Sequence, residues 1–327
     1  MNALKGCPVV VLNTARKVGI ELEFDSRSAC WHAPSPLPAG WTEKFDGSLN
    51  TGREYVLARP LKFSSAVEKA RAFSKAVRAA KTPVAKTGGF HVHVASGDLT
   101  TAQSIEVALF YNRFSSAVCE LVAASRRAIH WAALISPDTT PAQLIHMYSL
   151  NRPATNRDDA KYSRHYHAVN LAMVRCSRAA QRSIEFRQQS VSKHWQNIVG
   201  WTGFCVALVE SVKLGIPSRT VYPATFDGLV AMLQDYERET GSRGVADWVV
   251  WRRRYLSATA STADCEAVKA ALASVRGRHG LIWLATKCKL PYPVLLNAVS
   301  SLVRDRVITE RAGRFKFSGE RTSTSPQ

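Results

Sequence analysis

The sequence predicts an α+β protein with two domains, and three observations lead to this prediction. Four separate segments alternate apolar and ionisable residues with a period of two, which is typical of strands that face a core on one side. Helical patterns, with apolar residues three and four positions apart, lie between these segments. A small, polar stretch near residue 260 then separates a shorter C-terminal pattern. We therefore expect a first domain over residues 1–258 and a second over 262–320.

The first domain opens with the strand pattern KVGIELEF, in which Val18, Ile20, Leu22 and Phe24 alternate with polar positions. The other elements expected here are, in order, a strand near REYVLARPL, a helix that starts with the capping box Ser65 to Glu68 and ends before Pro83, a strand at GGFHVHVAS, a helix from about 101 to 127, strands at YHAVNLAMV and RSIEFRQQS, and an apolar helix at WQNIVGWTGFCVALVESVK.

The second domain shows a helix from about 264 to 275, a short helix at LIWLATKC, a helix from about 293 to 304 and two short strands around a glycine turn. This order resembles the winged helix-turn-helix family over residues 262–318. The resemblance implies DNA binding through a recognition helix and a wing. The DNA contacts that it implies are Asn297, Ser301 and Arg304 on the helix and Arg311 and Arg314 in the wing. The alternative is a module for protein interaction or dimerisation.

Charge and cysteine content narrow the class of partner and compartment. The chain has 44 Lys and Arg against 25 Asp and Glu, a net charge of +19, which favours polyanionic partners such as nucleic acid. Its seven cysteines are odd in number and contain no CxxC pair, so neither a disulfide framework nor a zinc knuckle is indicated. The longest early apolar run, Val9 to Leu12, is too short for a signal peptide or a membrane span. We expect a cytoplasmic protein.

The polar faces of the predicted strands together contain the donor groups of a metal site. If these strands share one sheet, the face opposite the core gathers Glu21, Glu23, Glu54, a histidine from His91 and His93, Glu185 and Arg187. Carboxylates with one imidazole suit Mg²⁺ or Mn²⁺, which keep water and phosphate oxygens as their other ligands. An arginine beside such a cluster is what phosphate transfer needs, because it neutralises developing charge.

Five segments, in order, resemble the amidoligase family of the carboxylate-amine ligase superfamily, which includes glutamine synthetase and glutamate-cysteine ligase. They are GIELEF, DGSLNTGREYVLARPL, GFHVHV, YHAVNL and SIEFRQ, and they cover about residues 17–213. The resemblance implies an antiparallel, glutamine synthetase-like sheet whose concave face holds divalent ions and ATP. It also implies a reaction in which a carboxylate is activated as an acyl phosphate and an amine attacks it to give an amide.

Site roles follow from this resemblance position by position. The metal ligands that it implies are Glu21, Glu23, Glu54, Glu185 and a histidine, for which we favour His93. Glu185 and Arg187 become the catalytic pair, with Arg187 contacting phosphate or the substrate carboxylate. Nucleotide-binding cations are expected in the loop RPATNRDDAKYSRHYH, where Arg152, Lys161 and Arg164 are candidates. Nothing in the sequence identifies the amine or the carboxylate substrate.

Other interpretations stay open beside this one. Glu21 and Glu23 also fit a solvent-facing strand balanced by Lys or Arg on its neighbours, and Arg187 also fits a structural ion pair with Glu185 or Glu54. At the level of function, one alternative is a DNA-binding regulator whose ligase-like domain has lost catalysis. Another is a metal-dependent nuclease, because carboxylates, histidine and a basic surface also suit that chemistry.

Overall fold

The structure is a computed structural model that describes residues 4, 6–24, 34–45, 53–82, 84, 88–123, 126, 132–136, 138–154, 167–256, 262–274, 279–288, 295, 298–299, 302, 308–311 and 314–317. The chain divides into two compact units, Met1–Trp251 and Arg252–Gln327. The domain boundary that we expected between residues 258 and 262 touches positions 257–261, which lie outside the described residues.

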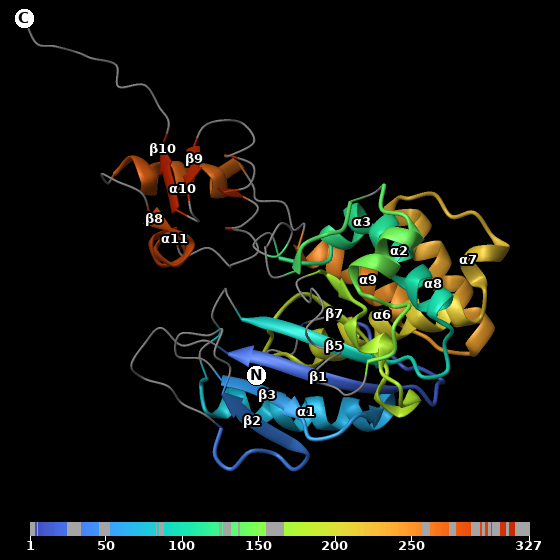
Figure 1. The fold of residues 1–327 in the computed structure, drawn as a ribbon. Helices are drawn as coiled ribbons and strands as arrows, with labels where there is room; N and C mark the ends of the chain where they lie inside the picture. Colours follow the sequence, from blue (N-terminus) through green and yellow to red (C-terminus); the bar gives the residue numbers. More distant parts are fainter. Residues whose placement is uncertain are drawn as a thin grey trace, which may run out of the picture. The chain divides into compact units, whose positions relative to one another are not determined.

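The first unit combines helices with an antiparallel sheet (Figure 1). Within the described residues this sheet has seven strands. The strands are β1 (Lys17–Phe24), β2 (Trp41–Phe45), β3 (Arg53–Leu57), β4 (Leu61–Lys62), β5 (Gly89–Ala95), β6 (Val169–Asn170) and β7 (Ser183–Ser190). Their order across the sheet is β2-β3-β1-β5-β7-β6, and β4 pairs with the start of β1. The α+β class expected from the sequence is therefore confirmed. Each of the five predicted strand segments contains a strand, but within YHAVNLAMV only β6 is extended and a 3-10 helix follows over Ala172–Arg175.

One face of this sheet is apolar because the alternation in each strand points the same way. The apolar residues of β1 are fully buried, as are Val92 and Val94 of β5 and Ile184 and Phe186 of β7. These side chains form one core with helices α1 (Phe63–Ala79) and α6 (Trp195–Lys213). The other side of the same strands is consequently left for the polar residues.

Further helices of the first unit correct one expectation. They are α2 (Thr101–Arg113), α3 (Ser115–Cys119), α4 (Pro141–Met147), α7 (Ile216–Arg219) and α8 (Phe226–Thr240). Helix α9 (Val245–Leu256) begins in the first unit and ends in the second. The long helix expected over 101–127 is wrong: it breaks at Phe114, whose buried ring packs on Phe110 at a centroid distance of 4.9 Å. Apolar periodicity does not separate one long helix from two that change direction over the same core.

The capping box expected at the start of α1 is also wrong. The helix begins at Phe63 with Lys62 as its N-cap and no side-chain cap bond. Leu61 and Lys62 pair with β1, so tertiary pairing, rather than Ser65, sets where the helix starts. The edge strand β2 was not predicted, because only Trp41 of its first four residues is buried and the pattern carries no alternation.

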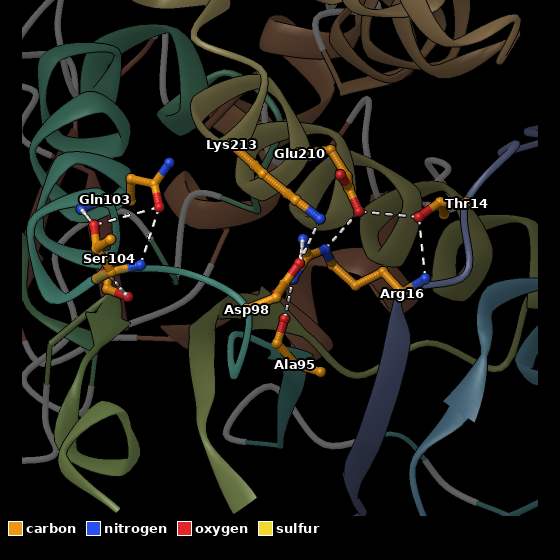
Figure 2. A network of polar contacts seen from close by, with 9 residues as sticks. Thr14, Arg16, Ala95, Asp98, Gln103, Ser104, Glu210 and Lys213 are labelled. Carbon is orange, nitrogen blue, oxygen red and sulfur yellow. Dashed lines mark hydrogen bonds and ion pairs between the residues drawn. The ribbon is translucent and has the colours of Figure 1, made fainter. Parts of the chain in front are cut away.

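A buried arginine ties the start of β1 to the end of β5 and to α6 (Figure 2). Arg16 is 7% exposed; its two terminal nitrogens lie 2.8 and 3.0 Å from the carboxylate oxygens of Asp98, and its Nε lies 2.6 Å from Glu210. It also donates to the carbonyl of Ala95. Lys213 contacts Asp98 from the outside. Removing water from a charge is favourable only when partners are this complete, so the network fixes three elements against one another.

The second unit is small and has its own core. It contains α10 (Thr262–Ala273), β8 (His279–Gly280), α11 (Leu281–Cys288), β9 (Ile308–Arg311) and β10 (Arg314–Phe317), and its three strands lie in the order β8-β10-β9. Residues 295, 298, 299 and 302 are helical and buried, a spacing that places one face of the expected third helix against Val268, Leu272 and Leu284. The helices at 264–275 and LIWLATKC and the final hairpin are confirmed.

Among the described residues, no helix is both long and apolar enough to cross a bilayer.

The Arg16 network predicts how stability depends on pH. Partial burial by itself would raise the pKa of Asp98, but hydrogen bonds from Arg16 and Lys213 outweigh it and lower the pKa to about 2. The folded-state pKa thus lies below that of the unfolded chain, near 3.8, so the stabilisation is complete above about pH 4 and is lost as the pH falls through about 2.

We expect Asp98→Asn to lower the free energy of unfolding at pH 6, and the gap between this variant and the wild type to narrow toward pH 2. Urea unfolding at both pH values measures the gap. Asp138→Asn, at an exposed turn position, is the control. A gap of equal size at both pH values would contradict the role given to the Arg16–Asp98 pair.

Candidate functional site

Three neighbouring strands bring ionisable side chains to the face of the sheet opposite the core, and a fourth adds an amide. In the register of the ladder, Glu21 of β1 lies opposite His91 of β5, and His93 of β5 lies opposite Glu185 of β7. Glu185 in turn lies opposite Asn170 of β6. Residues directly opposite each other in an antiparallel sheet share a face. We call the set Glu21, Glu23, His91, His93 and Glu185 the acidic cluster.

His93 is the point where two carboxylates of the cluster meet. Its Nε2 lies 3.1 Å from a carboxylate oxygen of Glu21 and 4.0 Å from one of Glu185. Ligand atoms of these three residues all lie within 4.8 Å of one another. The opposite residue in β1 is Gly19, and a Cβ at that position would lie 3.4 Å from the Cβ of His93. The small residue leaves space beside the imidazole.

His91 is more deeply buried than His93 and touches all three glutamates. Its side chain is 6% exposed; its Nδ1 lies 3.4 Å from Glu21 and 3.6 Å from Glu185, and its Nε2 lies 3.4 Å from Glu23. Sequence reasoning placed both histidines on this face and favoured His93 as the ligand. The ligand atoms of His93 converge with those of Glu21 and Glu185, whereas His91 lies between the carboxylates of Glu21, Glu23 and Glu185.

Gly88, just before β5, and Gly89, its first residue, allow Glu23 to approach the backbone. The N–H of Gly89 donates to Glu23 Oε2 at 2.7 Å. A Cβ at Gly89 would lie 2.6 Å from that oxygen and 2.8 Å from His91 Nε2, and one at Gly88 would lie 2.1 Å from the carbonyl of Glu23. The backbone clash excludes a side chain at position 88, and a side chain at position 89 would displace the Glu23 carboxylate and the His91 imidazole.

Glu54 belongs to the same face but to its margin. It lies directly opposite Glu23 in the β1–β3 ladder and opposite Lys44 in the β2–β3 ladder. Its side chain is half-buried. The three residues whose ligand atoms converge are Glu21, His93 and Glu185, so Glu54 is positioned beside the predicted metal site and Glu23 lies between them.

Glu185 is held from two sides. The amide of Asn170 donates to its Oε2 at 2.7 Å, and the guanidinium of Arg187 contacts its Oε1. The backbone N–H of Ala172 donates to the Asn170 side-chain oxygen at 2.9 Å, which fixes the orientation of that amide. The ion pair between Arg187 and Glu185 is one of the alternatives that the sequence left open. It also anchors a cation at the edge of the acidic cluster.

The pKa values reflect this crowding. Burial alone would raise the pKa of Glu21, but His93 and His91 outweigh it and hold the pKa well below its usual range. Burial opposes ionisation of Glu185 in the same way, and Arg187 with both histidines lowers its pKa. Burial would lower the pKa of His93, but Glu21 and Glu185 raise it to about 9. The cluster therefore favours ionised carboxylates and a positive partner between them.

A β-bulge and a buried arginine shape the β7 side of the site, and sequence reasoning missed both. Between the pairs Phe90–Gln189 and Val92–Phe186 the register shifts, so Arg187 and Gln188 together oppose His91. Arg126 supplies donors to the backbone there: its Nη2 lies 2.8 Å from the carbonyl of Arg187 and its Nε 3.4 Å from that of Gln188.

Arg126 is 2% exposed and also carries its charge near Glu23. Burial, the largest influence, lowers the pKa of its guanidinium, and Glu23 acts in the opposite direction. No sequence pattern marks this residue as part of the site, because its partners lie about sixty positions away in β7. The acidic cluster thus has two guanidinium groups along one side, Arg187 and Arg126.

The donor set fits a hard divalent cation. Two carboxylates and one imidazole are ligands that Mg²⁺ and Mn²⁺ accept, and the remaining positions suit water and phosphate oxygens. The buried Nε2 of His93 makes no hydrogen bond within the described residues, although it lies near Glu21. A metal ion between these atoms would give that nitrogen a partner and would also offset the repulsion between the carboxylates.

The other predicted site residues are placed only in part. Arg152 lies in an exposed turn after α4. Arg311 of β9 and Arg314 of β10 are paired across the hairpin, and their side chains are outside the described residues. The positions that fall outside the description altogether are Lys161, Arg164, Asn297, Ser301 and Arg304. Nucleotide and DNA contacts at these positions stay predictions.

No protein-family model matches this chain, and no curated protein matches it.

Removal of either converging carboxylate tests the metal site. We expect Glu21→Gln and Glu185→Gln each to raise the Kd for Mn²⁺ by more than about tenfold, since loss of even an outer-shell partner has that effect. Isothermal titration calorimetry on the apo protein measures Kd. Glu43→Gln is the control, because Glu43 sits on the edge strand β2 and pairs with Arg53. Equal Mn²⁺ affinity in the wild type and the three variants would contradict the assignment of the metal site.

Arg126 gives a second prediction. We expect Arg126→Met to lower the free energy of unfolding by about 1–3 kcal/mol, because the bulge carbonyls of Arg187 and Gln188 lose a buried donor. Urea unfolding measures the change. Arg152→Met removes an exposed arginine and should change stability by less than about 0.5 kcal/mol. The assignment fails if the two variants unfold alike.

Proposed function

We propose that the first unit is an ATP- and Mg²⁺-dependent carboxylate-amine ligase of the amidoligase type. The observation that supports this most is the convergence of Glu21, His93 and Glu185, from three strands of one antiparallel sheet, with Arg187 beside them. The resemblance of the strand motifs to that family expects metal ligands at these positions. An acidic face flanked by guanidinium groups is also the arrangement that phosphoryl transfer requires.

Each residue has a role in this proposal. Glu21, His93 and Glu185 would hold the ion, with Glu23 and Glu54 extending the carboxylate face toward β3. A divalent ion held there neutralises phosphate oxygens and makes the terminal phosphate of ATP easier to transfer to a substrate carboxylate. Arg187, fixed by Glu185, places a permanent positive charge where that carboxylate or the transferred phosphate binds. Asn170 and Arg126 hold the strand that carries both residues.

We also propose that the second unit is a winged helix that binds DNA. Its strand order β8-β10-β9, with helices α10 and α11 and a buried face at Leu295, Ala298, Val299 and Leu302, supports this proposal. The free thiols of the six described cysteines fit a reducing, cytoplasmic location. The amide would then be formed on a DNA-linked group, or DNA would localise the enzyme.

Nucleotide binding is the direct test of the ligase. We expect the full chain to bind ATP only with Mg²⁺ or Mn²⁺ and to form ADP when mixtures of amines and carboxylic acids are supplied. Glu185→Gln should abolish both, whereas Glu68→Gln, on the exposed side of α1, should not. ATP binding by calorimetry and ADP release by a coupled assay are the measurements.

The outcomes separate the alternatives. Absence of metal-dependent ATP binding in the folded chain would favour a regulator with an inactive ligase-like scaffold. Cleavage of DNA with Mg²⁺ and without ATP would favour a nuclease. Either result would overturn the ligase proposal.

A further inference from the structure

The first unit has a line of cations on α1 that the ligase proposal does not use. Between Lys62 and Lys81 the chain has six Lys or Arg and one acidic residue, Glu68. Arg71, Lys75 and Arg78 are spaced by four and three residues, so they lie along one side of the helix. Seven residues of helix span about 10 Å. Arg71 and Lys75 are exposed and Arg78 is half-buried.

The N-terminus of α6 continues this line with one further cation, Lys193, and with the imidazole of His194. Ser74 of α1 accepts a hydrogen bond from the N–H of Trp195 at 3.2 Å and donates to the carbonyl of Lys193, which joins the two helices. The Arg71 guanidinium lies 4.3 Å from the centre of the Trp195 ring. Lys193 and His194 precede that tryptophan directly. We call Arg71, Lys75, Arg78, Lys193 and His194 the basic stripe.

The charges of the stripe are not balanced by carboxylates within the described part of the chain. The Lys193 ammonium donates to a neutral group, the carbonyl of Thr82, at 2.9 Å. Burial and then the charge of Arg78 lower the pKa of Lys193, and burial, Arg78 and Lys193 lower that of His194. Nδ1 of His194 is buried and makes no hydrogen bond with a described residue. Cations brought together in this way attract a polyanion.

The surroundings distinguish between kinds of polyanion. Membrane-binding surfaces combine cations with exposed Trp, Phe or Leu. Among described residues the exposed large apolar side chains are four valines, of which only Val84 lies near the end of α1. The phosphates of one DNA strand recur every 3.4 Å along the axis, so a 10 Å line of cations matches about three of them.

We propose that the basic stripe is a second DNA-contacting surface, one that binds the phosphate backbone of a duplex without reading its sequence. The duplex would contact the first unit itself, in addition to any contact made by the winged helix. Phosphate contacts of this kind orient a protein on DNA, while groove contacts specify sequence.

The salt dependence of DNA binding tests this surface. The full chain is titrated with a 30-base-pair duplex of random sequence over a range of salt concentrations. Each lost phosphate contact reduces the slope of log K against log salt by about 0.9. We expect the triple variant Arg71→Gln, Lys75→Gln, Arg78→Gln to lose between two and three units of slope and to bind at least about tenfold more weakly in low salt.

A charge-matched control separates the stripe from net charge. Arg59→Gln, Arg178→Gln and Arg243→Gln together remove three exposed arginines scattered over the first unit. An equal slope for the two triple variants would overturn the proposal. Binding of anionic vesicles or of duplex RNA in place of DNA would overturn it as well. Arg311→Gln with Arg314→Gln reports on the wing alone, so failure of the winged helix is seen separately. Thermal melting verifies that all variants are folded.

Discussion

The central constraint in the first unit is that the sheet holds several carboxylates close together on one face. Glu21 and Glu23 are two positions apart on β1, and Glu185 lies on β7, on the other side of β5. Two such charges about 7 Å apart repel by roughly 2 kcal/mol at an effective dielectric of 20. They cannot turn away, because the intervening residues Val18, Ile20, Leu22 and Phe24 form the core on the other side of the sheet. Rotation of β1 would expose that core.

Positive groups offset part of this repulsion. Arg187 and Arg126 flank the carboxylates, and Glu21 with Glu185 raises the pKa of His93 to about 9. Hydrogen bonding within the cluster is incomplete, because Nε2 of His93 makes no hydrogen bond with a described residue. A rigid shell surrounds the cluster: the glycine pair fits around Glu23, Asn170 orients Glu185, and the Arg16 network holds the far end of β1. If a divalent ion binds at these positions, His93 would release its proton and coordinate the ion through the neutral imidazole.

The face of the site could be predicted from the sequence because alternation is a local property. Alternation shows which residues share a side in the segments KVGIELEF, GFHVHV and SIEFR. The structure places Glu21, His93, Glu185 and Arg187 on one face, as expected. Helix α6 has the bounds that its apolar run predicted. The helix face at Val299 is buried, as the pattern of the second unit indicated.

The rest could not be predicted, because it depends on contacts between distant segments. The bulge at Arg187 and Gln188 arises from a register shift against β5, and Arg126 donates to it from a segment about sixty positions away. Helix α1 begins at Phe63, and not at the capping box of Ser65, because Leu61 and Lys62 pair with β1. Gly89 leaves room for the buried His91 ring beside the Glu23 carboxylate. The glycine pair is visible in the sequence, but its role depends on where Glu23 lies in the fold.

Anomalous diffraction from crystals grown with Mn²⁺ and a non-hydrolysable ATP analogue tests the central claim most directly. The account predicts a manganese peak bounded by Glu21, His93 and Glu185, with phosphate oxygens of the nucleotide completing its coordination. Crystals in which the acidic cluster holds no manganese, with both histidines and Arg187 still paired to the glutamates, would contradict it.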